Sequence, residues 1–460
     1  MRKFVIIFIL LLSFTTFAQN YESLDKNFIN ELKSKIKLDS LHTALMYALQ
    51  NKQFKDVFVN KEILKHHDKY FTHEIKTGRI TDQKSTGRCW LYAGLNAIRP
   101  DIVKKVNIQD FEFSENYLYF WDKMEKANKF LEMVIARTGE NIRSRKFQRL
   151  LGNPIEDGGY WQNFVDLIKK YGCVPYEAMP EVESNHNSRQ MLANINFQLR
   201  YYAYKLKEMN DNGKSKEELR QAKKEYLKNI YKMLVLHLGY PVDTFTFKYF
   251  VKDKKGNKKI KIEHFTPISF AKKFVNENLD DYIMFANWPA REYYKYYKVE
   301  SSNNLIDGTP LDFINLPMEE IKKMMVKSIL ADYPVNFSSD VGKQSSTKLG
   351  IFNADLYKYS WVYDIQFDYN KKINTVVRNI NSTHAMVILG VDLFDNKPIK
   401  WKVENSWGTD AGDKGFFYMY DNWVDLFVVR VVVNKKFVPE KYIKILSQKP
   451  VIIPEDEPEQ

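Results

Sequence analysis

The spacing of apolar residues changes along this chain of 460 residues, and that change limits its fold more than any other feature. Apolar positions recur every three or four residues in the ranges 89–100, 114–134, 160–171, 188–209, 216–238 and 317–332, which predicts helices. The ranges 385–391, 400–403, 416–420 and 428–433 are continuously apolar, alternating or β-branched, which predicts strands. Helices early and strands late indicate an α+β protein with two lobes and a site between them.

Turn and cap signals refine this division. Pro100 is expected to end the helix that begins near Cys89. Ser215 and Glu218 form a capping box after the turn 211–213, so the ranges 188–209 and 216–238 are expected to form a helical hairpin. A two-stranded excursion is expected around residues 254–259, and short helices with a connecting arm are expected from Tyr21 to about Phe71.

The chain contains two cysteines, Cys89 and Cys173. Two cysteines are too few for a disulfide scaffold and match no structural zinc motif, so each is considered singly. The apolar fraction of 44% excludes collagenous and broadly disordered classes, and it leaves a large globular protein. Cys173 is expected to fill the core as a small hydrophobic side chain.

The first 18 residues have the pattern of a signal peptide. Arg2 and Lys3 precede an apolar stretch from Phe4 to Leu12, and Ala18 ends a suitable cleavage sequence. The alternative is a membrane anchor, but the stretch is far shorter than the roughly 20 residues that span a bilayer. No later segment approaches 18 uncharged apolar residues, so no transmembrane segment is expected. We therefore expect an exported protein, periplasmic or extracellular after cleavage.

Cys89 is the candidate nucleophile because it lies where a turn enters a helix. A thiol reacts as its thiolate, and both the helix dipole and a neighbouring imidazolium lower the thiol pKa. His384, directly before the apolar strand, is the candidate base, and Asn405, after the next strand, can orient its ring. Trp407 can shield that hydrogen bond, and Gln83 can donate to an oxyanion beside the Cys89 backbone N–H.

These residues resemble the papain superfamily of cysteine peptidases, and further motifs resemble its bleomycin hydrolase and aminopeptidase C family. The similarity runs from about Phe71 to Pro454. The motifs that carry it are Ser85-Thr86-Gly87-Arg88-Cys89-Trp90, Asp157-Gly158-Gly159, Lys170-Tyr171-Gly172 with Pro175, Asp340-Val341-Gly342-Lys343, Lys402-Val403-Glu404-Asn405-Ser406-Trp407-Gly408 and the ending from Pro439-Glu440 to Pro450-Val451-Ile452-Ile453-Pro454.

The resemblance implies an α+β, papain-like two-lobed core with a large helical insertion and a C-terminal arm in the cleft. It also implies a homohexameric ring that acts on peptide substrates as an aminopeptidase, without a metal or an organic cofactor. Cys89, His384, Asn405 and Gln83 would be catalytic. The expected substrate-binding residues are Asp340, Trp407, Gly158, Gly159 and Gln460, whose carboxylate would meet the substrate's α-amine. For Asp340 the alternative is that it only ends a strand.

The expected division follows from these motifs and from the helix and strand pattern. It comprises a signal peptide (1–18), an N-terminal arm with helices (19–70), a helical lobe with the catalytic cysteine (71–180), a mostly helical insertion (181–334), a β-rich lobe with the catalytic histidine and asparagine (335–445) and a C-terminal arm (446–460).

Alternatives remain open from the sequence. The tail from Glu455 to Gln460 is acidic and shorter than in typical members, so some endopeptidase action is expected beside aminopeptidase action. An exported ring-shaped binding scaffold with little turnover is the alternative function, and a transglutaminase-like transferase is disfavoured by Asn405 and Gln83. The net charge of +13 leaves nucleic acid as a conceivable partner, but glutamates among the lysines of 216–259 favour a solvated helical face.

Overall fold

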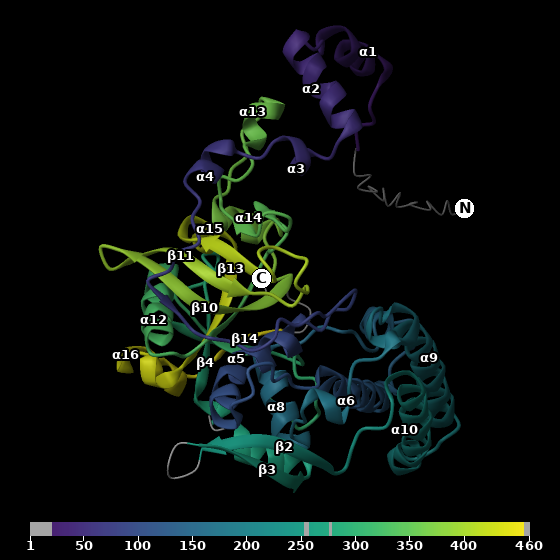
Figure 1. Cartoon of the computed structure of the whole chain (residues 1–460). Coiled ribbons are helices and arrows are strands. Elements are labelled where there is room, and N and C mark those ends of the chain that lie inside the picture. Colours follow the sequence, from purple (N-terminus) through teal and green to yellow (C-terminus); the bar gives the residue numbers. More distant parts are fainter. Residues whose placement is uncertain (1–20, 253–256, 276–277, 455–460) are drawn as a thin grey trace, which may run out of the picture.

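The structure is a computed structural model that describes residues 21–252, 257–275 and 278–454 (Figure 1). The expected signal peptide and the tail from Glu455 to Gln460 lie outside the described residues. The predicted substrate contact of Gln460 therefore has no structural description.

A single large sheet forms the centre of the fold. Within the described residues it has twelve strands, in the order β14-β5-β6-β4-β13-β7-β10-β11-β12-β9-β8, with β1 also paired to β10. The strands are β1 (His73–Glu74), β4 (Tyr282–Ala286), β5 (Lys295–Val299), β6 (Asp312–Asn315), β7 (Val335–Ser339), β8 (Ser345–Ser346), β9 (Ile351–Phe352), β10 (His384–Phe394), β11 (Lys397–Glu404), β12 (Phe416–Tyr420), β13 (Val428–Asn434) and β14 (Val451–Ile453). All residues of β13 and most residues of β10 are buried, which explains their β-branched and apolar sequences.

Helices pack against this sheet and form the rest of the core. Helix α5 packs against β10 and β7, while α12 packs against β10, β13 and β7. The helices are α5 (Cys89–Val106), α6 (Glu115–Arg137), α7 (Arg145–Gly152), α8 (Trp161–Tyr171), α9 (Arg189–Asp211), α10 (Lys216–Leu238), α11 (Pro267–Phe274), α12 (Met318–Leu330), α13 (Tyr359–Tyr363), α14 (Lys371–Val376), α15 (Asp421–Phe427) and α16 (Glu440–Ile443).

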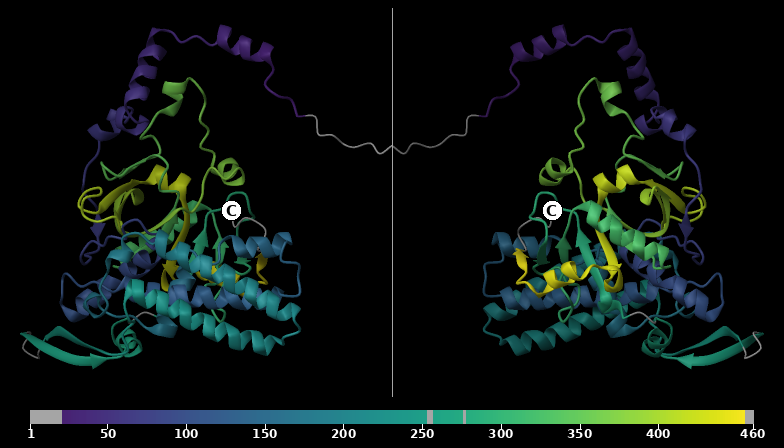
Figure 2. Two further views of the ribbon diagram at one scale, coloured as in Figure 1. Left: turned by 90° about the vertical axis from the view of Figure 1, so that its right-hand side faces the viewer. Right: turned by 90° about the vertical axis from the view of Figure 1, so that its left-hand side faces the viewer.

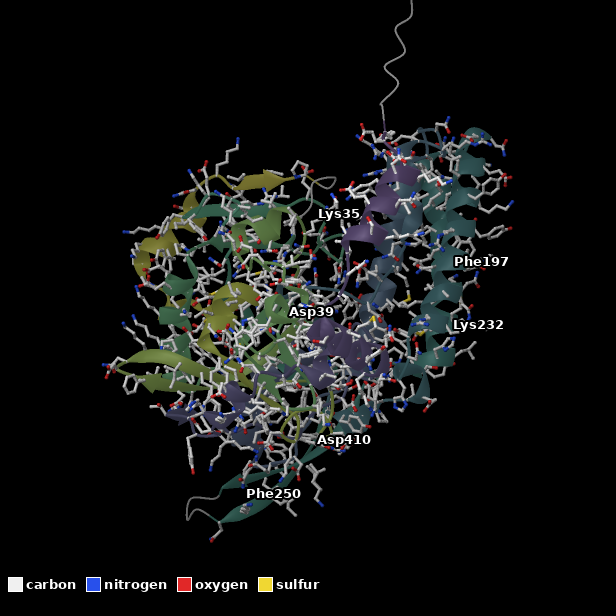
Figure 3. All side chains as sticks on the ribbon, turned by 90° about the horizontal axis from the view of Figure 1, so that it is seen from above. Lys35, Asp39, Phe197, Lys232, Phe250 and Asp410 are labelled. Atoms are coloured by element: carbon white, nitrogen blue, oxygen red, sulfur yellow. The ribbon has the colours of Figure 1, made fainter. Side chains whose placement is uncertain are left out.

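The expected helical hairpin is present as α9 and α10. Both helices pack on α6, and the Ser215–Glu218 capping box starts α10. Their outer faces are solvated, as the outward positions of Phe197 and Lys232 show (Figure 3). The expected two-stranded excursion is the separate hairpin of β2 (Phe245–Lys252) and β3 (Lys258–Phe265), which projects at one corner of the molecule (Figure 2).

The prediction that Pro100 ends its helix is wrong. Helix α5 continues to Val106 with Pro100 inside it, and Asn107 in the left-handed conformation ends it. Proline removes one backbone hydrogen bond and costs about 3 kcal/mol in a helix interior. Burial of Ile102 and Val106 beyond the proline offsets that cost, because the second half of the helix is part of the core.

The segment expected as a mostly helical insertion, 181–334, also supplies strands to the main sheet. Its strands β4, β5 and β6 are not separate from the core, since they extend the main sheet beyond β13. Strand β14 then joins the same end by pairing parallel to β5. The C-terminal segment thus reaches the sheet edge at Ile453, beside the loop that follows β5.

The N-terminal arm contains α1 (Lys26–Lys35), α2 (Ser40–Asn51), α3 (Phe54–Val57) and α4 (Lys61–Lys65). Helices α1 and α2 lie away from the sheet and bury none of their residues (Figures 1 and 2). Phe54 joins the base of the arm to α13 by stacking on Tyr359 and Tyr363. Among the described residues, no helix combines the length and the apolar character that crossing a membrane requires.

Candidate active site

Cys89 is the first residue of α5 and lies in the groove between the helical layer and the sheet. Its sulfur accepts a hydrogen bond from the backbone N–H of Ala385, the residue after His384. Helix and strand therefore meet where the sequence predicted nucleophile and base. Burial raises the pKa of the Cys89 thiol, whereas the N–H groups of Ala385, Trp90 and Cys89 itself oppose that rise by favouring the thiolate.

The imidazole of His384 is oriented by Asn405. Strand β10 begins at His384 and its neighbour β11 ends at Glu404, so the two side chains meet at one edge of the sheet. His384 Nε2 lies 2.8 Å from Asn405 Oδ1, which also accepts from the Ser406 backbone N–H at 2.8 Å. An oxygen acceptor at Nε2 assigns the ring proton to that atom and leaves Nδ1 for proton exchange with a thiol.

Trp407 covers the histidine. The two rings stack with their centroids 4.7 Å apart and an angle of 25° between the planes. His384 is only 6% exposed, and burial lowers its pKa to about 4, while the Asn405 hydrogen bond acts in the opposite direction. Burial thus disfavours an isolated charge on either His384 or Cys89. Proton transfer between them creates opposite charges together, which stabilise each other in a site of low dielectric.

Gln83 is held beside Ser406, the residue after Asn405, in the segment that follows β11. Its backbone N–H donates to Ser406 O at 2.9 Å, and its Oε1 accepts from Ser406 Oγ at 2.7 Å. Its Nε2 donates to Thr86 O at 2.6 Å, so one amide hydrogen is occupied in the turn before Cys89. The second amide hydrogen is the one that remains for an oxyanion.

Asp157 positions the turn that carries Cys89, a role that the sequence did not assign. Its Oδ2 accepts from the Gly87 N–H at 3.0 Å and from Ser188 Oγ at 2.5 Å, and its Oδ1 accepts from Tyr119 OH at 2.6 Å. These hydrogen bonds and nearby Lys123 hold the pKa of Asp157 well below its usual range, against the effect of burial. In the sequence, the motif Asp157-Gly158-Gly159 pointed to this turn. It did not indicate that Asp157 would hold the turn before Cys89 in place.

A buried ion pair joins the helix of Cys89 to the strand before Asn405. Arg99 of α5 contacts Glu404 of β11, and their side chains are 1% and 0% exposed. Thr77 also donates to Glu404 Oε2 at 2.6 Å. In the sequence, Glu404 appeared only as part of the motif around Asn405. Its ion pair could not be predicted, because Arg99 lies 305 positions away in the sequence.

A cavity of about 820 Å³ opens beside Cys89 and His384. Gly158 and Gly159, which were predicted to bind substrate, line this cavity. Gly159 must lack a side chain because a Cβ there would lie 2.6 Å from the Trp90 ring. Asp340 and Trp407 are not among its lining residues within the described chain. Asp340 instead accepts from the Asn381 N–H at 3.2 Å, and so supports the loop that leads to His384.

The described residues contain no group of three histidine, cysteine or acidic side chains placed to hold a metal ion. Cys173 is free and fully buried, and burial raises its pKa far above that of an ordinary thiol.

Comparison with known proteins agrees with this geometry. Residues 23–458 match the Peptidase C1-like family. The chain is 38% identical over 383 residues to aminopeptidase C of Lactobacillus delbrueckii subsp. lactis, covering 83% of this chain and 85% of that protein. It is 35% identical over 415 residues to human bleomycin hydrolase, covering 88% and 90%. The crystal structure of PepW from Lactobacillus rhamnosis matches with a TM-score of 0.89 and 36% identity, covering 95% and 98%.

A cysteine at the start of a central helix, facing a strand that begins with an asparagine-oriented histidine, defines the papain-like class of cysteine peptidases. The predicted α+β papain-like fold is thus confirmed. The chain belongs to the Peptidase C1-like family, and its relatives are proteins named aminopeptidase C and bleomycin hydrolase.

Proposed function

We propose that this protein is a cysteine aminopeptidase that removes N-terminal residues from peptides. The observation that carries the proposal is the alignment of Cys89, His384 and Asn405, with the Cys89 sulfur at the Ala385 N–H and His384 Nε2 2.8 Å from Asn405 Oδ1. The named relatives support hydrolysis over the alternative of a ring-shaped scaffold without turnover.

The proposed reaction uses this chain's own groups in two steps. His384 Nδ1 takes the Cys89 proton, and the thiolate attacks the carbonyl carbon of the first peptide bond. The Cys89 N–H and the Gln83 amide stabilise the oxyanion, and the C–N bond then breaks as His384 returns the proton to the leaving amine. His384 next takes a proton from water, whose oxygen attacks the thioester and releases the amino acid and the free thiol.

The test compares two cysteine variants. Cys89→Ala should lower hydrolysis of an alanyl amide by at least about 10⁴-fold and abolish labelling by a thiol reagent at that position. The matched variant Cys173→Ala removes the buried thiol outside the site, and it should keep turnover. Substantial hydrolysis by Cys89→Ala would refute the nucleophile.

Preference for a free N-terminus is a separate part of the proposal. The unmodified peptide should be trimmed at least about tenfold faster than its N-acetylated form, since the proposal assigns recognition of the α-amine to the C-terminal carboxylate of Gln460. Equal rates of internal cleavage in the acetylated peptide would reject exclusive trimming and support the endopeptidase action expected from the short acidic tail.

We also propose export and assembly into a hexamer. The sequence of residues 1–18 supports cleavage after Ala18 and a periplasmic or extracellular location. The exposed arm helices α1 and α2 support self-association, because helices of 10 and 12 residues that bury nothing are only marginally stable alone. Sequencing the N-terminus of the secreted protein tests the first proposal, and the mass in solution tests the second.

A further inference from the structure

Helix α6 carries a buried cluster of charges that the proposed mechanism does not use. Asp122 and Lys123 are fully buried, and Lys126 is 7% exposed. The Nζ atoms of Lys123 and Lys126 lie 2.7 Å and 3.1 Å from Asp122 Oδ2. Because each ion loses its hydration, burying such a cluster is a poor source of stability. Its presence therefore needs another explanation.

Lys126 holds a segment that contains a glycine of the cavity lining. Its Nζ donates to Glu156 O at 2.8 Å and also to Gly158 O. The carbonyl between them, Asp157 O, accepts from Trp90 Nε1 at 2.7 Å. Three consecutive carbonyl groups thus have side-chain donors from α5 and α6, and the segment is fixed to these two helices.

This segment forms part of the cavity beside the catalytic pair. Gly158 and Gly159 both line the cavity, and Gly159 packs directly against the Trp90 ring. Lys126 itself also lines the cavity. A peptide bound beside Cys89 therefore meets a wall whose position depends on the hydrogen bonds of Lys126.

The same face of α6 reaches a second segment of the cavity lining. Residues 300–304 follow β5 and line the cavity. Asn304 Nδ2 donates to Asp122 Oδ1 at 2.8 Å, and Lys129 Nζ donates to Ser301 O at 2.5 Å. Helix α6 thus holds both segments.

The helix is suited to act as a rigid support. Asp122, Lys126 and Lys129 follow one another at spacings of four and three residues, so they share one helix face. Helix α6 has 23 residues and packs against α5, α8, α9 and α10. Buried polar groups that satisfy one another make their surroundings rigid.

We propose that Lys126 is a positioning residue that holds the two cavity segments in the arrangement that a bound peptide needs. It acts directly on Gly158, and it acts through Asp122 on Asn304. This inference rests on the proposed peptidase function. Within the described residues, the hydrogen bonds and ion pair of Lys126 do not involve the catalytic pair, so its loss should weaken peptide binding and spare the chemical step.

The experiment compares Lys126→Met with the unaltered protein on a free tetra-alanine peptide. Methionine fills a similar space without an ammonium group. We expect KM to rise about tenfold while kcat stays within about twofold. The rate at which iodoacetamide alkylates Cys89 should also stay within about twofold, because this small reagent does not depend on the cavity segments.

A conservative variant and a matched control separate positioning from general stability. Lys126→Arg keeps a charged donor and should give an intermediate KM, since the shape of the donor group differs. Lys146→Met makes the same change as Lys126→Met at an exposed lysine outside the cavity, and it should leave KM unchanged. Thermal unfolding shows whether each variant is folded.

Asn304→Ala breaks the network at its other end and should also raise KM. The double variant with Lys126→Met should raise KM by less than the product of the two single effects, because both residues act through Asp122. If Lys126→Met does not fold, KM in Lys126→Arg and Asn304→Ala carries the test.

An unchanged KM in the folded variants, even with lower stability, would overturn the positioning role of Lys126. A fall in kcat together with slower alkylation would also overturn it, because Lys126 would then act on Cys89. Independent effects in the double variant would refute the link through Asp122. Failure of the unaltered protein to hydrolyse the peptide would instead count against the proposed peptidase function.

Discussion

In the proposed mechanism, Asn405 acts by orienting His384. Because its Oδ1 is the acceptor at Nε2, Asn405→Ala should leave the ring free to turn and favour the wrong tautomer. We expect kcat to fall by about 10²-fold with little change in KM, as measured with an alanyl amide. A rise in KM at unchanged kcat would instead assign Asn405 to substrate binding.

The buried imidazole of His384 links stability to pH. Its pKa is lowered to about 4 in the folded protein, against about 6.5 in an unfolded chain. Below pH 6.5 the unfolded state takes up a proton that the folded state refuses, so stability falls between pH 6.5 and 4 by up to about 3 kcal/mol. Urea unfolding at several pH values should show this loss in the native protein and a smaller loss in His384→Gln. Identical pH profiles would mean that folding leaves the pKa of His384 unchanged.

At the residue scale, the sequence was informative where chemistry restricts the choice of side chain. A cysteine at a helix start, a histidine before a strand and an asparagine after the next strand could be proposed from residue type, spacing and resemblance. Asp157 and Glu404 could not be, because each acts through partners far away in the sequence. An aspartate in a Gly-rich turn or a glutamate at a strand end has many ordinary uses until those partners are known.

The turn that ends in Gly159 is packed against the first turn of α5. A Cβ at Gly159 would lie 2.6 Å from Trp90, whereas one at Gly158 meets nothing closer than 3.8 Å. Gly159→Ala should therefore destabilise the protein by about 1–3 kcal/mol through overpacking, measured by denaturant unfolding. Gly158→Ala is the matched control and should cost clearly less. Similar losses of stability in both variants would show that the Trp90 contact is not the reason why residue 159 must be glycine.

Helix α5 and strand β11 are joined through Arg99 and Glu404. Glu404→Leu leaves a buried guanidinium without its counter-charge, so we expect a loss of about 3–5 kcal/mol. The double variant Arg99→Met with Glu404→Leu removes both charges and should be more stable than Glu404→Leu alone. Additive losses in this double-mutant cycle would contradict a direct coupling between the helix and the strand.

At the element scale, periodicity located most long helices and the central strands. It failed at Pro100, since a local stop signal was overridden by the burial of Ile102 and Val106. It also could not show that β4, β5 and β6 join the main sheet, because strand pairing depends on contacts across more than a hundred residues. Local sequence thus indicated which elements form, and tertiary packing decided how far they run and what they pair with.

The molecule consists of a packed core and an N-terminal arm whose first two helices make no contribution to the main hydrophobic core. Leu24, Ile36 and Leu41 of the arm are 70%, 69% and 63% exposed, and α1 and α2 contribute nothing to the main core. Capping by Asp25 and Asp39 supports each helix start but does not replace a packed face. Exposed apolar side chains that lie close together often mark an interaction site, which is the basis for proposing the arm as a contact between copies of the chain.

Replacing two of these side chains tests the arm as the contact between copies. Native protein should have the mass of a six-chain assembly in light scattering, and Ile36→Asp with Leu41→Asp should shift it to a smaller species. Because neither residue is buried within one chain, the melting temperature of the isolated subunit should change little. Phe394→Asp removes an equally exposed apolar residue of β10, outside helices α1 and α2, and should preserve the assembly. An unchanged mass in the arm variant would assign assembly to another surface, and a monomeric native protein would refute the hexamer.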